Sequence, residues 1–167
     1  MISWKEFSAS ESDLASAGER LLFQYGVGLA YLATIRHDGG PRLHPVSPVL
    51  SEGHLYVFVL PDSPKRADLS RDPRFALQTF PPPDFDFTKE GEEFYVTGCA
   101  EPVGQYLARA SVVADARQHV SAEEFLFELK ITRVMHTIWK TGDTGLQPSR
   151  RHWRAAESKS HSAEPGA

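Results

Sequence analysis

The chain has 167 residues, of which 41% are apolar and 24% are charged, and its formal net charge is −4. This length favours one domain with a substantial hydrophobic core. The acidic balance provides no electrostatic footprint for nucleic acid or for an anionic membrane, so we expect neither as a partner.

The single cysteine, Cys99, excludes an internal disulfide framework and a multi-cysteine metal site. One free thiol is typical of a reducing compartment. The sequence contains no 18-residue apolar run and no basic segment followed by an apolar one at its start, which argues against a spanning helix and a signal peptide. We therefore expect a cytoplasmic protein.

The first predicted element is a helix that begins at Ser10 and runs to about Tyr25. Ser10 is followed three residues later by Asp13, which is the spacing of a capping box. The apolar stretch 27–35 (VGLAYLATI) then predicts a strand that is buried on both faces.

A hairpin turn is predicted at 37–40 (HDGG), because Asp-Gly and Gly-Gly tolerate positive φ. The return strand, 41–50, contains Pro45 and Pro48, which remove two backbone donors. We therefore expect this strand to lie at a sheet edge, to be bulged, or to face a ligand. A second turn follows at 51–54.

The next strand, 55–60, leads into a short helix that begins at Ser63-Pro64 and ends at Asp72-Pro73. Lys65 and Arg66 lie in the first turn of this helix. The helix dipole and its free N–H groups already favour an anion there, so two cations are unfavourable unless an anion binds. This pattern predicts a small phosphate site, and the alternative is that both side chains are solvated surface charges.

Three further strands and one helix complete the predicted elements: strands at 74–80, 93–102 and 125–139, and a helix at 104–119. Gly98 predicts a bulge or a close approach of backbones. The loop at 81–91 is rich in Pro, Phe and Asp, so we expect it to pack on a partner or over a pocket. Residues 140–155 are expected to form a tail, and 156–167 a disordered end.

Six or seven strands joined mostly by hairpins, with three helices at the margins, predict a mainly β fold. Hairpins imply antiparallel pairing, and so many strands in a short chain favour a closed barrel over an open sheet. Parallel βαβ units are absent, which argues against a Rossmann fold. We expect one domain over 1–155.

The sequence contains no HExxH, GxSxG or P-loop motif. Its seven histidines lack the spacing of a metal site, so we predict none. His44 alone stands out, because it shares a strand face with Arg42. A phosphate site without a strong nucleophile or base suggests chemistry supplied by a phosphate-bearing cofactor.

Three segments, AYLATIRHDGGPRLHPVSPVL, LYVFVLPDSPKRADLSRDPRFAL and EFYVTGCAEPV, resemble the flavin-binding split-barrel superfamily of pyridoxamine 5'-phosphate oxidase. The resemblance implies an antiparallel split β-barrel with flanking helices. It also implies a homodimer with FMN in each of two interface clefts, and a redox reaction on a small molecule.

The residues that the resemblance places around the cofactor are Arg42, His44, Pro45, Val46, Ser47, Phe58, Val59, Ser63, Lys65, Arg66, Glu93 and Trp153. Ser63, Lys65 and Arg66 would hold the phosphate, with Arg42 near it, and the segment 44–46 would lie along the ring.

Phe58 and Val59 would pack near the ring and the ribityl chain. Glu93 falls where relatives place a polar ring contact, and Trp153 would reach the cofactor from the partner subunit. The resemblance identifies no catalytic residue.

Ser47 stands where the oxidase itself carries a lysine, and Pro64 where it carries an arginine. We therefore expect a relative that uses FMN or a deazaflavin coenzyme. A deazaflavin-dependent reductase needs further basic residues for the acidic tail of its coenzyme, and Arg71 and Arg74 are the candidates.

A non-catalytic flavin- or haem-binding stress protein is the remaining alternative. Haem needs an axial ligand, and the candidates for it are His44 and His136.

Overall fold

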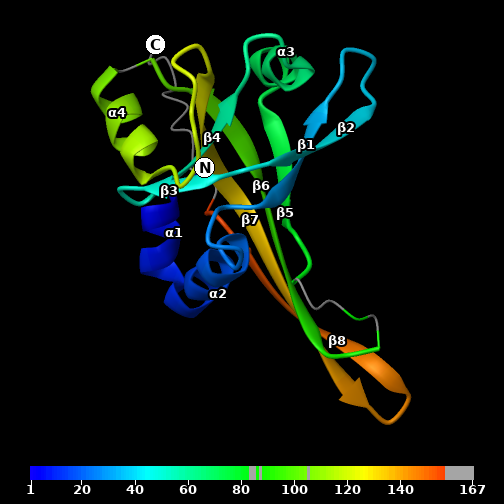
Figure 1. Ribbon diagram of the computed structural model, residues 1–167. Helices are drawn as coiled ribbons and strands as arrows, with labels where there is room; N and C mark the ends of the chain where they lie inside the picture. The colour runs from blue at the N-terminus through cyan, green and yellow to red at the C-terminus, as the bar shows by residue number, and fades with distance from the viewer. Residues whose placement is uncertain (83–85, 87, 105, 157–167) are drawn as a thin grey trace, which may run out of the picture.

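The computed structural model describes residues 1–82, 86, 88–104 and 106–156, the side chains of 106–108 excepted (Figure 1). Its helices are α1 (Trp4–Ser10), α2 (Ser12–Leu22), α3 (Pro64–Arg71) and α4 (Tyr106–Asp115). Its strands are β1 (Ala30–Ile35), β2 (Pro41–Val46), β3 (Val49–Ser51), β4 (His54–Val59), β5 (Arg74–Thr79), β6 (Gly91–Pro102), β7 (Phe125–Gly142) and β8 (Gly145–Arg154).

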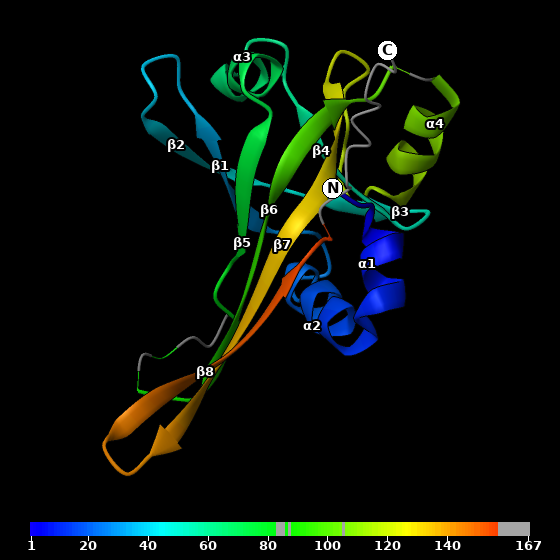
Figure 2. The same ribbon diagram turned by 180° about the vertical axis from the view of Figure 1, so that it is seen from behind.

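The strands form one antiparallel sheet in the order β2-β1-β5-β6-β7-β4-β3, with β8 paired to β7. The sheet curls strongly, and the β7–β8 hairpin extends from the body of the molecule at the end away from α3 (Figures 1 and 2). The mainly β, antiparallel fold predicted from the sequence is confirmed.

The long strand β7 divides the sheet, because two strands share one of its edges. Its first residues, 125–128, pair with β4, and its last residues, 133–142, pair with β8. Between them, Ile2 fills the edge: its N–H donates to Ile131 at 3.0 Å and its carbonyl accepts from Ile131 at 2.8 Å. The N-terminus therefore occupies the point at which the barrel splits.

Helix α1 begins at Ser3, whose hydroxyl and backbone form a capping box with Glu6. Trp4 and Phe7 then enter the main core together with Phe94. The sequence analysis missed this helix, and its prediction of Ser10 as a cap is wrong. Ser10 is the last residue of α1, and α2 starts at Ser12.

The proline-interrupted segment 41–50 lies at the edge of the sheet, as predicted. The chain breaks at Ser47-Pro48, so that 41–46 forms β2 and 49–51 forms β3. These two strands end the sheet on opposite sides, and no ladder joins them in the part of the chain that the structure describes.

The C-terminal region differs most from the expectation. Residues 145–154 are not a tail but strand β8, which pairs with β7 from Gly142–Gly145 to Arg133–Arg154. The predicted helix at 104–119 is shorter and ends at Asp115. Phe85 and Phe87 of the aromatic loop lie outside the described residues, as does the expected disordered end beyond residue 156. Among the described residues, no helix is both long enough and apolar enough to cross a membrane.

Candidate binding site at strand β2 and helix α3

Arg42 and Thr34 lie opposite each other on the paired strands β2 and β1, and both reach Asp68 of helix α3. Arg42 Nε donates to Asp68 Oδ2 at 2.7 Å, and Thr34 Oγ1 donates to the same oxygen at 2.9 Å. Asp68 is only 2% exposed. Burial by itself raises the pKa of Asp68, but hydrogen bonds from Arg42, Thr34 and Arg71 outweigh it and hold the pKa below its ordinary value.

His44 lies two residues along β2 on the same face as Arg42. Its Nε2 atom is buried and has no hydrogen-bond partner in the protein. Burial, Lys65 and Arg42 all lower the pKa of His44, whereas Asp68 opposes them. Burial also lowers the pKa of Lys65. The fold thus gathers two cations and an unsatisfied imidazole nitrogen between β2 and the start of α3.

Helix α3 begins where the sequence predicts. Ser63 is its N-cap, Pro64 follows at the first helical position, and the first turn contains no acidic residue. The Ser63 hydroxyl makes no capping bond. Pro64 has no N–H, and the Arg66 N–H already donates to the Ser63 carbonyl at 2.9 Å, which leaves the N–H of Lys65 at this helix start. Arg66 points elsewhere: its guanidinium lies 4.4 Å from the ring centroid of Phe125.

Other predicted residues lie along the same strands but on different faces. Val46 and Val59 are buried in the main core. Phe58 points the opposite way and packs in a second cluster with Val112 of α4 and Leu126. Pro45 is exposed on β2, opposite Tyr31.

Glu93 and Trp153 are not brought to this cluster by the single chain. Glu93 pairs with Thr137 near the base of the β7–β8 hairpin, whereas α3 leads into the start of β5, which pairs with the other end of β6 at Cys99. The Trp153 ring packs against Phe7 of its own chain, with 4.9 Å between ring centroids.

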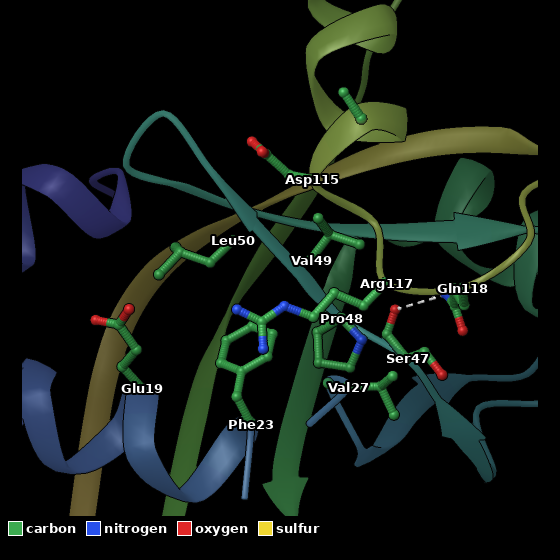
Figure 3. A pocket seen from close by; sticks show the side chains of 12 residues that line it. Glu19, Phe23, Val27, Ser47, Pro48, Val49, Leu50, Asp115, Arg117 and Gln118 are labelled. Atoms are coloured by element: carbon green, nitrogen blue, oxygen red, sulfur yellow. Dashed lines mark hydrogen bonds between the residues drawn. The ribbon is translucent and has the colours of Figure 1, made fainter. Parts of the chain in front are cut away.

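Ser47 borders a cavity of about 410 Å³ at the β2–β3 junction. Phe23, Pro48 and Leu50 provide apolar walls, and the charged side chains of Glu19 and Arg117 also line it (Figure 3). The predicted cofactor segment 42–47 therefore runs from the cationic cluster to an open, partly apolar cavity.

His136, the second candidate axial ligand for haem, lies on β7 away from His44. Its Nε2 atom is 2.7 Å from Glu92 Oε2, which also accepts from Arg20 at 2.7 Å. Hydrogen bonds from Arg20 and His136 keep the pKa of Glu92 low, although burial alone raises it. This polar group ties α2 to the sheet.

Sequence reasoning missed Asp68, which connects the cluster. The signal was present in part: Asp68 lies three residues after Lys65 and three before Arg71, so the three share one helix face. Nothing in the sequence shows that Arg42 and Thr34 meet it.

No family model matches the sequence, and a search of curated proteins finds no relative. Solved structures with a similar fold include a haem-binding protein from Mycobacterium smegmatis (20% identity, TM-score 0.57, 80% of this chain). The chain spans only 57% of that protein's length.

A candidate 5-nitroimidazole antibiotic resistance protein from Bacteroides thetaiotaomicron is 12% identical, with a TM-score of 0.62 over 80% of this chain and 86% of that one. A candidate pyridoxamine 5'-phosphate oxidase from Lactobacillus delbrueckii is 24% identical, with a TM-score of 0.52 over 70% and 89%. At these identities the likeness concerns the fold. The chain therefore has the split β-barrel fold that pyridoxamine 5'-phosphate oxidase-like proteins share, as its sequence resemblance indicated.

Proposed function

We propose that this protein binds FMN in a homodimer and is an oxidoreductase that acts on a small molecule. The observation that carries the proposal is the buried, unpartnered Nε2 of His44 beside Lys65 and Arg42. A buried polar atom without a partner is costly, and neighbouring cations repel each other. An anion at the start of α3 relieves both costs, because a phosphate accepts hydrogen bonds from these groups and is attracted by the positive end of the helix dipole.

The geometry of β2 fits a flavin whose phosphate lies at the α3 end. From Arg42 to Ser47 an extended strand covers roughly 16 Å at its usual rise per residue. A ribityl chain and ring laid along this strand reach the cavity at Ser47. When bound, the flavin supplies hydride chemistry, and the chain's own residues hold the phosphate, orient the ring and exclude water.

FMN fits better than a deazaflavin coenzyme with an acidic tail, because both arginines that would hold such a tail already bind carboxylates. Arg71 donates to Asp68, and Arg74 donates to both oxygens of Asp72 at 2.9 and 2.6 Å. Hydrogen bonds from Arg74 are the main cause of the low pKa of Asp72, about 2. Lys65 has no carboxylate partner among the described residues, and Arg42 contacts Asp68 through Nε, which leaves its terminal nitrogens for one terminal phosphate.

The absorbance spectrum of the purified protein, followed by titration with FMN, FAD and a deazaflavin coenzyme, tests this proposal. We expect a flavin spectrum and tightest binding of FMN. A haem spectrum would favour the non-catalytic haem-binding alternative, and tighter binding of the deazaflavin would favour the reductase.

We expect FMN affinity to respond to pH through His44. Its lowered pKa keeps the imidazole neutral in the free chain at neutral pH, and an adjacent phosphate raises that pKa. FMN binding then takes up a proton at His44, so protonation of this histidine strengthens FMN binding as the pH falls. Phosphate protonation acts equally on a His44→Gln variant. The ratio of wild-type to variant affinity should therefore rise as the pH falls, and a constant ratio would exclude His44 from the site.

We further expect an obligate dimer. Three large apolar side chains near the site remain exposed in the single chain: Leu43 by 64%, Leu60 by 59% and Phe125 by 43%. The Arg66 guanidinium lies over the Phe125 ring, and Arg66 follows Lys65 in the first turn of α3. A partner subunit that covers Phe125 would therefore border the cationic cluster. Light scattering at micromolar concentration measures this directly, and a stable, flavin-loaded monomer would contradict it.

A further inference from the structure

Asp68 receives hydrogen bonds from three elements of the fold: Thr34 on β1, Arg42 on β2 and Arg71 within α3. Its carboxylate is almost completely buried, and the distances from Thr34 and Arg42 are 2.9 and 2.7 Å. Arg71 holds the arrangement from the other side, since it also donates to the carbonyl of Ile35 at the end of β1. Asp68 is therefore fixed in place before any ligand binds.

The contact with Arg42 is made through Nε alone. A guanidinium has five N–H groups in one plane, so a bond at Nε sets the orientation of that plane and leaves both terminal nitrogens available. The Arg42 side chain is 31% exposed, so those nitrogens are within reach of a ligand.

We propose that Asp68 is a positioning residue, which orients Arg42 so that its terminal nitrogens bind the phosphate of the cofactor. This inference rests on the proposed function, because it assigns a role at the same phosphate site. Asp68 itself touches no phosphate and acts through Arg42.

Two other roles for Asp68 predict results that differ from those of the positioning role. If only its charge mattered, removal of that charge would strengthen the binding of an anion. If Asp68 served only the fold, its replacement would weaken the binding of all flavins equally. The positioning role alone predicts a loss that is confined to ligands with a phosphate.

The test compares FMN with riboflavin, which lacks the phosphate, by flavin fluorescence on the full chain. In Asp68→Asn the preference for FMN over riboflavin should fall about tenfold, since one charge-assisted contact is misdirected. Asp72→Asn is the matched control: it removes a carboxylate from the C-cap of the same helix, where the partner is Arg74 rather than Arg42. That control should leave the preference unchanged.

A second variant covers the possibility that Asp68→Asn does not fold. Arg42→Lys retains the positive charge, but lysine carries all its donors on one nitrogen, which cannot contact Asp68 and also take the place of both terminal nitrogens of Arg42. Its FMN preference should fall by a similar factor. Where both single variants fold, the double variant should lose little more than either alone, because the two residues act as a unit.

An unchanged or increased FMN preference in Asp68→Asn overturns the inference, as does an unchanged preference in Arg42→Lys. Additive losses in the double variant also overturn it. If the wild-type protein binds FMN and riboflavin equally, the proposed FMN-binding function is contradicted, and the positioning role of Asp68 is contradicted with it.

Discussion

Lys65→Ala should weaken FMN binding by roughly tenfold to a hundredfold, while the free protein keeps its stability. A charge-assisted hydrogen bond to a phosphate contributes about 1.5–3 kcal/mol, and the expected factor follows from that range. In the free chain, burial already disfavours the Lys65 charge, as the lowered pKa indicates. Lys65 also lowers the pKa of His44, so its removal lets that pKa rise toward its ordinary value.

The measurement pairs FMN titration with the melting temperature of the free protein. Lys140→Ala is a suitable control, because Lys140 is exposed on β7 near the hairpin and distant in the fold from α3. Arg66→Ala should have a milder effect, since Arg66 lies over the Phe125 ring. If Lys65→Ala binds every flavin as tightly as the wild type does, Lys65 is a solvated surface charge and the phosphate site is wrong.

Gly98→Ala should destabilise the fold by about 3 kcal/mol or more, the upper range for overpacking against neighbours that cannot move. The register of β6 and β7 shifts between Thr97 and Gly98, which confirms the bulge predicted there. A Cβ at Gly98 would lie 1.7 Å from the carbonyl oxygen of Lys130. That oxygen belongs to the backbone of β7 next to Ile131, where Ile2 completes the split edge, so the collision cannot be relieved by a side-chain rotation.

For a chain of this size, the cost corresponds to a fall in melting temperature of roughly 6–12 °C. Gly91→Ala is the matched control, because Gly91 lies on the same strand and an added Cβ there meets nothing within 4 Å. We expect the control to melt like the wild type or slightly higher. Equal melting of Gly98→Ala and Gly91→Ala would show that the bulge adjusts without cost.

The elements that the sequence by itself determined are those governed by local chemistry. Prolines set the two ends of helix α3, whose caps are Ser63 and Asp72. Pro64 fits the first helical turn, and Pro73 cannot continue the helix. Prolines placed β2 at an edge, because they lack the donor that an inner strand needs. The missed helix α1 belongs to this class too, since Ser3 and Glu6 have capping-box spacing.

The phosphate-site hypothesis also began from local chemistry, with two cations at a helix start. Its partners were beyond local reasoning. Asp68 is 26 residues from Arg42 and 34 from Thr34 in the chain, and only the register of β1 with β2 beneath α3 brings the three together.

Strand β8 was likewise decided by tertiary structure. Residues 145–154 (GLQPSRRHWR) are mostly polar and exposed, so they lack the alternating apolar pattern by which a half-buried strand is recognised. Their strand conformation comes from hydrogen bonds to the part of the β7 edge that β4 leaves unpaired. Backbone donors and acceptors are nearly the same whatever the side chain, so the sequence does not show which strand edge they will pair with. That pairing is decided when the sheet assembles.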